Sequence, residues 1–102
     1  MRAKKIKALN SLEVTEWSAS SGELEYVVVE NSRENRKILL EAGFTKEQLS
    51  EATDGLDEEI DLVTLAVNYA NIYCWIKGRG FVEEDVYNEW ERQKNKDTEQ
   101  IL

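Results

Sequence analysis

The stretch 57–77, DEEIDLVTLAVNYANIYCWIK, has the most continuous apolar pattern in the chain. Wound as a helix of about 3.6 residues per turn, it places its polar positions on one narrow stripe and leaves the rest of its surface apolar. A helix that is apolar almost all round is buried in a core or against a partner. The pattern therefore predicts a long buried central helix over residues 57–77. The polar stripe consists of Asp57, Asp61, Thr64, Asn68 and Asn71.

Both ends of this predicted helix carry terminating signals. Asp57 can accept the free N–H groups of the first turn. Gly78 and Gly80 supply the left-handed conformation that ends a helix, and cations at 77 and 79 suit that end of the helix dipole. A membrane span needs about 20 predominantly apolar residues. Because polar residues interrupt this stretch, we expect no membrane partner.

Two stretches read as short strands. Residues 24–30, LEYVVVE, are rich in strong β formers. Residues 4–9, KKIKAL, alternate charged and apolar positions, which is the pattern of a half-buried strand. Two strands alone make a poor sheet, so either they pack on the central helix or a partner chain extends them.

Residues 11–20 fit two structures. Val14 and Trp17 are three residues apart and would share one face of a short helix capped by Asn10 or Ser11. We prefer this helix. In the alternative, the same stretch is a strand of a hairpin that turns at residues 20–22.

Local capping signals predict two further helices. Asn31 with Glu34 reads as a capping box that opens a helix ending at Gly43. Thr45 with Gln48 repeats the signal and opens a short helix that runs to about residue 53, before a turn at 54–55.

The C-terminal part reads as one more helix. Val82, Val86 and Trp90 recur every four residues after a group of acids, so this helix has an apolar stripe. The polar residues 96–102 read as a frayed tail. We therefore predict one compact domain over residues 1–95.

Together these elements predict a small, mostly helical α+β domain. Its two short strands, at about 4–9 and 24–30, pack on the long buried central helix over 57–77, together with three or four shorter helices. Aromatic residues are expected to fill the core. They are Trp17, Phe44, Trp75, Phe81 and Trp90.

Composition and charge limit the number of domains, the kinds of partner and the cellular location that we expect. At 102 residues the chain has the size of one domain. The net charge of −8 disfavours direct nucleic-acid binding. The first ten residues are nevertheless basic, which indicates either solvated lysines beside an edge strand or an electrostatic contact for acidic partners or nucleic acid. A single cysteine and no secretory signal indicate a reducing, cytoplasmic location.

Enzyme chemistry has little support. The chain has no histidine, the most frequent general base and metal ligand. Cys74 lies in the predicted buried helix, where a thiol behaves as a small hydrophobe. The isolated pair Gly78 and Gly80 lacks the strand-then-helix context of a phosphate-binding loop. We predict no catalytic residue, cofactor or metal.

Two sets of residues are candidates for contact with a partner. Aromatic residues on the central helix cannot all face one core, and tyrosine and tryptophan are enriched in binding hot spots. This set is Tyr69, Tyr73 and Trp75, together with Arg79, a cation after the helix that could contact an acid of a partner. The second set is an acidic run, read first as helix capping and a solvated surface and otherwise as a contact surface. It contains Glu47, Glu51, Asp54, Asp57, Glu58 and Asp61.

The sequence favours a non-enzymatic protein-interaction domain that self-associates into a homo-oligomer through the apolar central helix. The alternative is a small acidic inhibitor or nucleic-acid mimic that occupies a basic site on a partner protein. An enzyme that uses only carboxylates, tyrosine, lysine or arginine is the third and weakest candidate.

Overall fold

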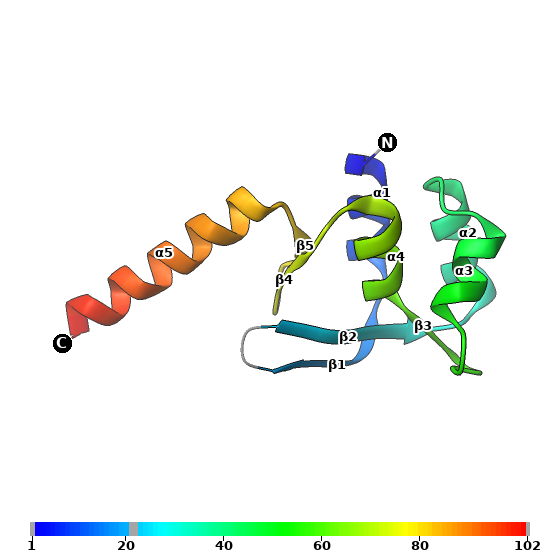
Figure 1. Ribbon diagram of the computed structural model, residues 1–102, viewed down its shortest axis with the longest axis horizontal. Helices are drawn as coiled ribbons and strands as arrows, with labels where there is room; N and C mark the ends of the chain where they lie inside the picture. The colour runs from blue at the N-terminus through cyan, green and yellow to red at the C-terminus, as the bar shows by residue number, and fades with distance from the viewer. Residues whose placement is uncertain (1, 21–22, 102) are drawn as a thin grey trace.

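Helices cover one face of a three-stranded sheet, and a small hairpin and a long helix extend from this core (Figure 1). The computed structural model describes residues 2–20 and 23–101, so most of the turn predicted at 20–22 lies outside the described residues. Within the described part, the chain is a small α+β domain with five helices and two antiparallel sheets. The elements are α1 (Arg2–Ser11), β1 (Val14–Ser20), β2 (Glu23–Glu30), α2 (Arg33–Glu41), α3 (Lys46–Ala52), β3 (Glu59–Asp61), α4 (Leu62–Ala70), β4 (Cys74–Ile76), β5 (Gly80–Val82) and α5 (Glu84–Ile101).

The larger sheet has the strand order β1-β2-β3 and is antiparallel throughout. Its central strand β2 confirms the strand predicted at residues 24–30. Val27 and Val29 are fully buried, and Ile60 of β3 pairs with Val29 on the same face of the sheet. The helices complete this core with Leu9, Leu39, Leu49, Leu62 and Leu65.

Strand β1 replaces the helix preferred for residues 11–20, so that prediction is wrong and the strand alternative is confirmed. The pairing with β2 shifts between Val14 and Glu16, which leaves Thr15 as the extra residue of a β-bulge. Residues three apart on a regular strand point to opposite faces. The bulge instead places Val14 and Trp17 on the same side. An irregular strand thus produces the spacing that resembled a helix.

The strand predicted at residues 4–9 is also wrong, because this stretch belongs to helix α1. Two of its cations bind the C-terminal end of α4. Arg2 Nη2 donates to the carbonyl oxygen of Asn71 at 2.8 Å, and Lys5 Nζ donates to that of Tyr69 at 3.0 Å. A cation is favoured at this end of a helix dipole. Part of the basic N-terminus therefore stabilises the fold itself.

The long helix predicted over 57–77 is only partly right. Helix α4 spans nine residues, and its N-cap is Asp61, with β3 occupying the positions before it. Asn71 adopts the left-handed conformation, with φ of 55°, and ends the helix. The next residues, 72–76 (IYCWI), are mostly β-branched and aromatic, and they lead into strand β4.

Helices α2 and α3 are confirmed. At the start of α3, the Gln48 backbone N–H donates to Thr45 Oγ1 at 3.1 Å, and the Thr45 N–H donates to Gln48 Oε1 at 3.0 Å. This is the predicted capping box. At α2 the cap is Ser32, whose hydroxyl accepts from the Asn35 N–H at 3.1 Å. The capping residue predicted at Asn31 is therefore one position early.

Helix α5 projects away from the rest of the domain (Figure 1). Its first turn contains Glu84 and Asp85, which suit a helix start. The domain limit at residue 95 and the frayed tail at 96–102 stay predictions, and residue 102 lies outside the described residues. Within the described part of the chain, no helix combines the length and apolar character needed to cross a bilayer.

Candidate functional site

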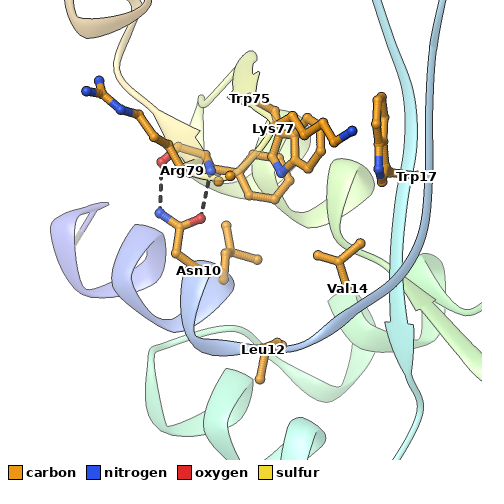
Figure 2. A pocket seen from close by; sticks show the side chains of 11 residues that line it. Asn10, Leu12, Val14, Trp17, Trp75, Lys77 and Arg79 are labelled. Atoms are coloured by element: carbon orange, nitrogen blue, oxygen red, sulfur yellow. Dashed lines mark hydrogen bonds between the residues drawn. The ribbon is translucent and has the colours of Figure 1, made fainter.

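Two tryptophans from distant parts of the chain meet where β1 faces the β4–β5 hairpin (Figure 2). The ring centroids of Trp17 and Trp75 lie 4.9 Å apart, at an interplanar angle of 44°. This separation suits a favourable aromatic pair. Lys77 Nζ lies 5.6 Å from the centroid of the Trp17 ring, within the range of a cation–π contact. The Trp17 side chain still exposes 39% of its surface.

A hollow of about 350 Å³, here called the tryptophan groove, opens between this pair and α1. Its walls are largely apolar. Lys77 and Arg79 are the only charged residues among those that line it, and no carboxylate does. In a chain with a net charge of −8, this hollow is locally positive. The labelled residues of Figure 2 that line it are Asn10, Leu12, Val14, Trp17, Trp75, Lys77 and Arg79.

A second hollow of about 480 Å³, the α5 groove, adjoins the first because Trp17, Trp75 and Lys77 line both. On its α5 side, the ring centroids of Tyr87 and Trp90 lie 5.6 Å apart. The two grooves form one continuous region, here called the aromatic surface. Its partly or largely exposed aromatic residues are Trp17, Tyr73, Trp75, Tyr87 and Trp90.

Asn10 of α1 holds the hairpin that carries Trp75. The Asn10 Nδ2 donates to the carbonyl oxygen of Phe81 at 2.9 Å, and the Phe81 N–H donates to Asn10 Oδ1 at 2.7 Å. One side-chain amide therefore satisfies both backbone groups of a β5 residue, as a neighbouring strand would. The dashed lines in Figure 2 mark these two bonds.

The turn between β4 and β5 sets the position of the two cations. The Arg79 N–H donates to the carbonyl oxygen of Ile76 at 2.9 Å and closes the turn. Gly78 and Gly80 have φ of +89° and +91°. They have the left-handed conformation that the sequence indicates, but they shape a hairpin rather than ending a helix. Lys77 consequently extends across the tryptophan groove toward Trp17, whereas Arg79 borders the groove and its side chain points away from Trp17 (Figure 2).

Three of the four predicted contact residues come together at the grooves. Trp75 lines both, Tyr73 lines the α5 groove, and Arg79 lines the tryptophan groove. Tyr69 does not join them. It lies on α4, where its hydroxyl donates to the Glu51 carboxylate, and this hydrogen bond raises the pKa of Tyr69.

The predicted aromatic core divides into two groups. Phe44 and Phe81 are buried, exposing 3% and 2% of their surface. Trp17, Trp75 and Trp90 are only partly covered and line grooves instead. The interpretation of all tryptophans as core missed Trp17 and Trp90 as site residues. The strand alternative for residues 11–20 was the signal for Trp17, because an edge strand leaves side chains accessible.

The predicted acidic run is distributed over three successive parts of the fold. Glu47 and Glu51 lie on α3. Asp54, Asp57 and Glu58 lie in the connection from α3 to β3, and Asp61 is the N-cap of α4. Glu51 is already engaged, because it accepts from Asn68 Nδ2 at 3.3 Å and from the hydroxyl of Tyr69. Residues 54–58, DGLDE, are here called the acidic loop.

Acids outside that run gather around Tyr26 on the sheet. The Tyr26 hydroxyl donates to Glu16 Oε1 at 3.3 Å. The charge of Glu16, then burial, and then the charges of Glu25 and Glu59 raise the pKa of Tyr26. These carboxylates come from all three strands and are distant from one another in the sequence. No local sequence pattern therefore indicated that they lie close together.

The remaining reactive group has little nucleophilic character. Burial raises the pKa of the Cys74 thiol, and the charge of Glu84 raises it further. A protonated thiol is a weaker nucleophile than a thiolate, so these two effects lower the reactivity of Cys74. Among the described residues, no group of three or more cysteine, aspartate or glutamate side chains is arranged to hold a metal ion.

Replacing Asp61 with asparagine is expected to flatten part of the pH dependence of stability. Burial raises the pKa of Asp61 above its ordinary value of 3.8, against hydrogen bonds from Val63, Val27 and Thr64 that lower it. The folded chain therefore binds this proton more tightly than the unfolded chain. The contribution of Asp61 to stability falls as the pH rises from 3.8 through the folded pKa. Asparagine caps a helix without a buried charge.

Urea unfolding from acidic to neutral pH measures this effect. The Asp61→Asn variant should gain stability relative to the natural chain as the pH rises. Asp61→Ala serves as the control, because it loses the cap and about 1 kcal/mol with it. A difference between Asp61→Asn and the natural chain that is the same at every pH would contradict the prediction.

The tryptophan groove and the acidic loop are the features from which a function can be inferred. No protein-family model, curated protein or solved structure matches this chain. A function for it therefore rests on the geometry and charge of these residues.

Proposed function

We propose that the chain is a non-enzymatic protein-interaction domain that associates with a second copy of itself through the aromatic surface. The observation that carries this proposal is the exposure of large aromatic side chains beside one another. Tyr73 exposes 64% of its surface and Trp17 exposes 39%, next to the partly covered Trp75. Tyrosine and tryptophan are enriched among the residues that dominate binding energies in protein interfaces.

Helix α4 itself is less suited to self-association. Leu62, Leu65 and Ala66 are fully buried within their own domain. The aromatic residues expected to extend that helix toward a partner instead follow it, on and before β4. The proposed contact therefore uses Tyr73 and Trp75 but not the apolar face of the helix.

The lack of carboxylate and histidine side chains in the grooves supports a binding role. The residues that line the tryptophan groove and the α5 groove include no carboxylate, and the chain has no histidine. Proton transfer near neutral pH most often uses one of these groups. The proposal assumes a reducing, cytoplasmic setting, in which a free cysteine such as Cys74 stays a thiol.

Light scattering after size exclusion, over a range of concentrations, tests the proposal. The natural chain should form an oligomer. Tyr73→Ala should weaken it by about 2 kcal/mol or more, as expected for a hot spot. Trp75→Ala should do the same, and thermal unfolding of both variants should remain cooperative.

Tyr26→Ala is the matched control, because it removes a tyrosine that lies among the acids of the sheet and lines neither groove. This variant should assemble like the natural chain. A natural chain that stays monomeric at every concentration would refute self-association. Equal dissociation of the Tyr26 variant would refute the assignment of the surface.

A small acidic inhibitor or nucleic-acid mimic is the second candidate. Its support is the group of carboxylates from Glu16, Glu25 and Glu59 around Tyr26, which gives one region of the sheet a negative potential. Such a role would use a basic site on a partner protein. This second candidate does not explain why tryptophan side chains are exposed, so self-association is the stronger proposal.

A further inference from the structure

We infer that the tryptophan groove of one copy receives the acidic loop of a second copy, in a head-to-tail contact. This inference rests on the proposed self-association and specifies its two faces. It joins two features that the fold keeps apart, a positive aromatic hollow and a negative loop with an apolar residue in its middle.

The groove side offers apolar walls and positive charge. Trp17, Trp75 and Val14 contribute the walls, and Lys77 and Arg79 contribute the charge. The ion pairs among the described side chains involve neither of these two cations. Both cations are exposed. They are therefore available to carboxylates from another molecule.

The loop side offers the opposite charges around an apolar anchor. Leu56 is partly exposed and lies between the exposed Asp54 on one side and the exposed Asp57 and Glu58 on the other. None of these three carboxylates takes part in an ion pair among the described side chains. An apolar side chain flanked by acids is complementary in charge to an apolar groove that carries cations.

Hydrogen bonds fix the backbone of the loop before any partner arrives. The Leu56 N–H donates to the carbonyl oxygen of Thr53 at 2.9 Å, and the Asn31 N–H donates to that of Glu58 at 2.8 Å. A loop that is already held at both ends loses little conformational entropy on binding. Leu56 can therefore act as a preorganised anchor.

The two features cannot meet within one molecule. Figure 1 shows the connection between α3 and β3, which contains the acidic loop, at the opposite end of the sheet from the β4–β5 hairpin. A contact between them requires a second copy. Because different surfaces of the two copies touch, the contact is heterologous and generates a ring or an open chain of subunits.

Two charge-reversed variants test this arrangement by light scattering. The Lys77→Glu/Arg79→Glu variant reverses the charge of the groove and leaves the loop unchanged. The Asp57→Lys/Glu58→Lys variant reverses the charge of the loop and leaves the groove unchanged. Each alone should assemble about tenfold or more weakly than the natural chain, because like charges would face one another. In an equimolar mixture the intact loop of one variant meets the intact groove of the other, and the reversed groove meets the reversed loop with opposite charges, so assembly should be restored.

The controls carry the same changes in net charge elsewhere. Lys4→Glu/Lys7→Glu on α1 and Glu34→Lys/Glu41→Lys on α2 alter exposed residues away from both faces and should assemble like the natural chain. Normal assembly of the Asp57→Lys/Glu58→Lys variant would overturn the inference, and so would a mixture that stays monomeric. In both cases, a natural oligomer that Tyr73→Ala dissociates would leave the proposed function standing. A natural chain that never assembles refutes both.

Discussion

Replacing Gly80 with alanine is expected to cost the fold about 2–5 kcal/mol, well above the cost of the same change at Gly78. Both glycines have a left-handed backbone, with φ of +91° and +89°, which costs an alanine about 1–2 kcal/mol. They differ in their surroundings. A Cβ at Gly80 would lie 2.7 Å from Cγ of Asn10, whereas nothing lies within 4 Å of one at Gly78. Overpacking of this kind adds about 1–3 kcal/mol.

Urea denaturation of the two variants measures the difference directly. Asn10→Ala should lose stability in the natural background, because it leaves both backbone groups of Phe81 without their partner. In the Gly80→Ala background, the same change should cost less, since it also removes the clash. Equal losses at Gly80 and Gly78 would show that backbone strain alone matters and that the Asn10 contact is loose.

Leu65→Ala is expected to destabilise the domain by about 2–5 kcal/mol, the usual cost of a large cavity in a well-packed core. Leu65 is fully buried on α4, the helix that packs on β2, α1 and α3. The loss should be the same at low and high protein concentration, because the cavity forms within one chain. Thermal unfolding over a range of concentrations provides the measurement.

Asn68→Ala is the matched control, since Asn68 lies on the same helix but is exposed. Among the described residues its side chain bonds to Glu51 alone, at 3.3 Å, so the loss should stay below about 1 kcal/mol. If high concentration restored the stability of the Leu65→Ala variant, α4 would face a second chain, and its burial within the domain would be the wrong interpretation.

Local signals were the reliable part of the sequence. The capping box of Thr45 and Gln48 needs only four consecutive residues and no distant partner, and α3 begins where it predicts. The run of β formers in β2 is equally local. Elements whose identity depends on partners elsewhere were harder to predict, as α1 demonstrates. Its cations bind carbonyl groups of α4, which no pattern in the first ten residues reveals.

The length of α4 was overestimated for a different reason. A buried strand and a buried helix are both apolar, so periodicity alone does not separate them in a short run. The decisive residue is Asn71, whose left-handed conformation ends the helix before the aromatic stretch begins. This shift moves Tyr73 and Trp75 from a helix face to the grooves.

The candidate site could be predicted only in part. Tyr73, Trp75 and Arg79 were recognised because their residue types are common in interfaces. Trp17 and Lys77 join them only through the packing of β1 against the β4–β5 hairpin. This packing depends on a β-bulge in β1 that no local sequence pattern predicts.

The bonds between Asn10 and Phe81 join residues that are 71 positions apart. A ribosome makes α1 early and β5 late, so during synthesis the asparagine has no backbone to bind. Helix α1 also packs on α2 and α4, which are made before β5, so β5 supplies the last part of its cover. Docking of α1 is therefore complete only after the distal hairpin has left the ribosome. Incomplete chains expose apolar surface that attracts chaperones and proteases.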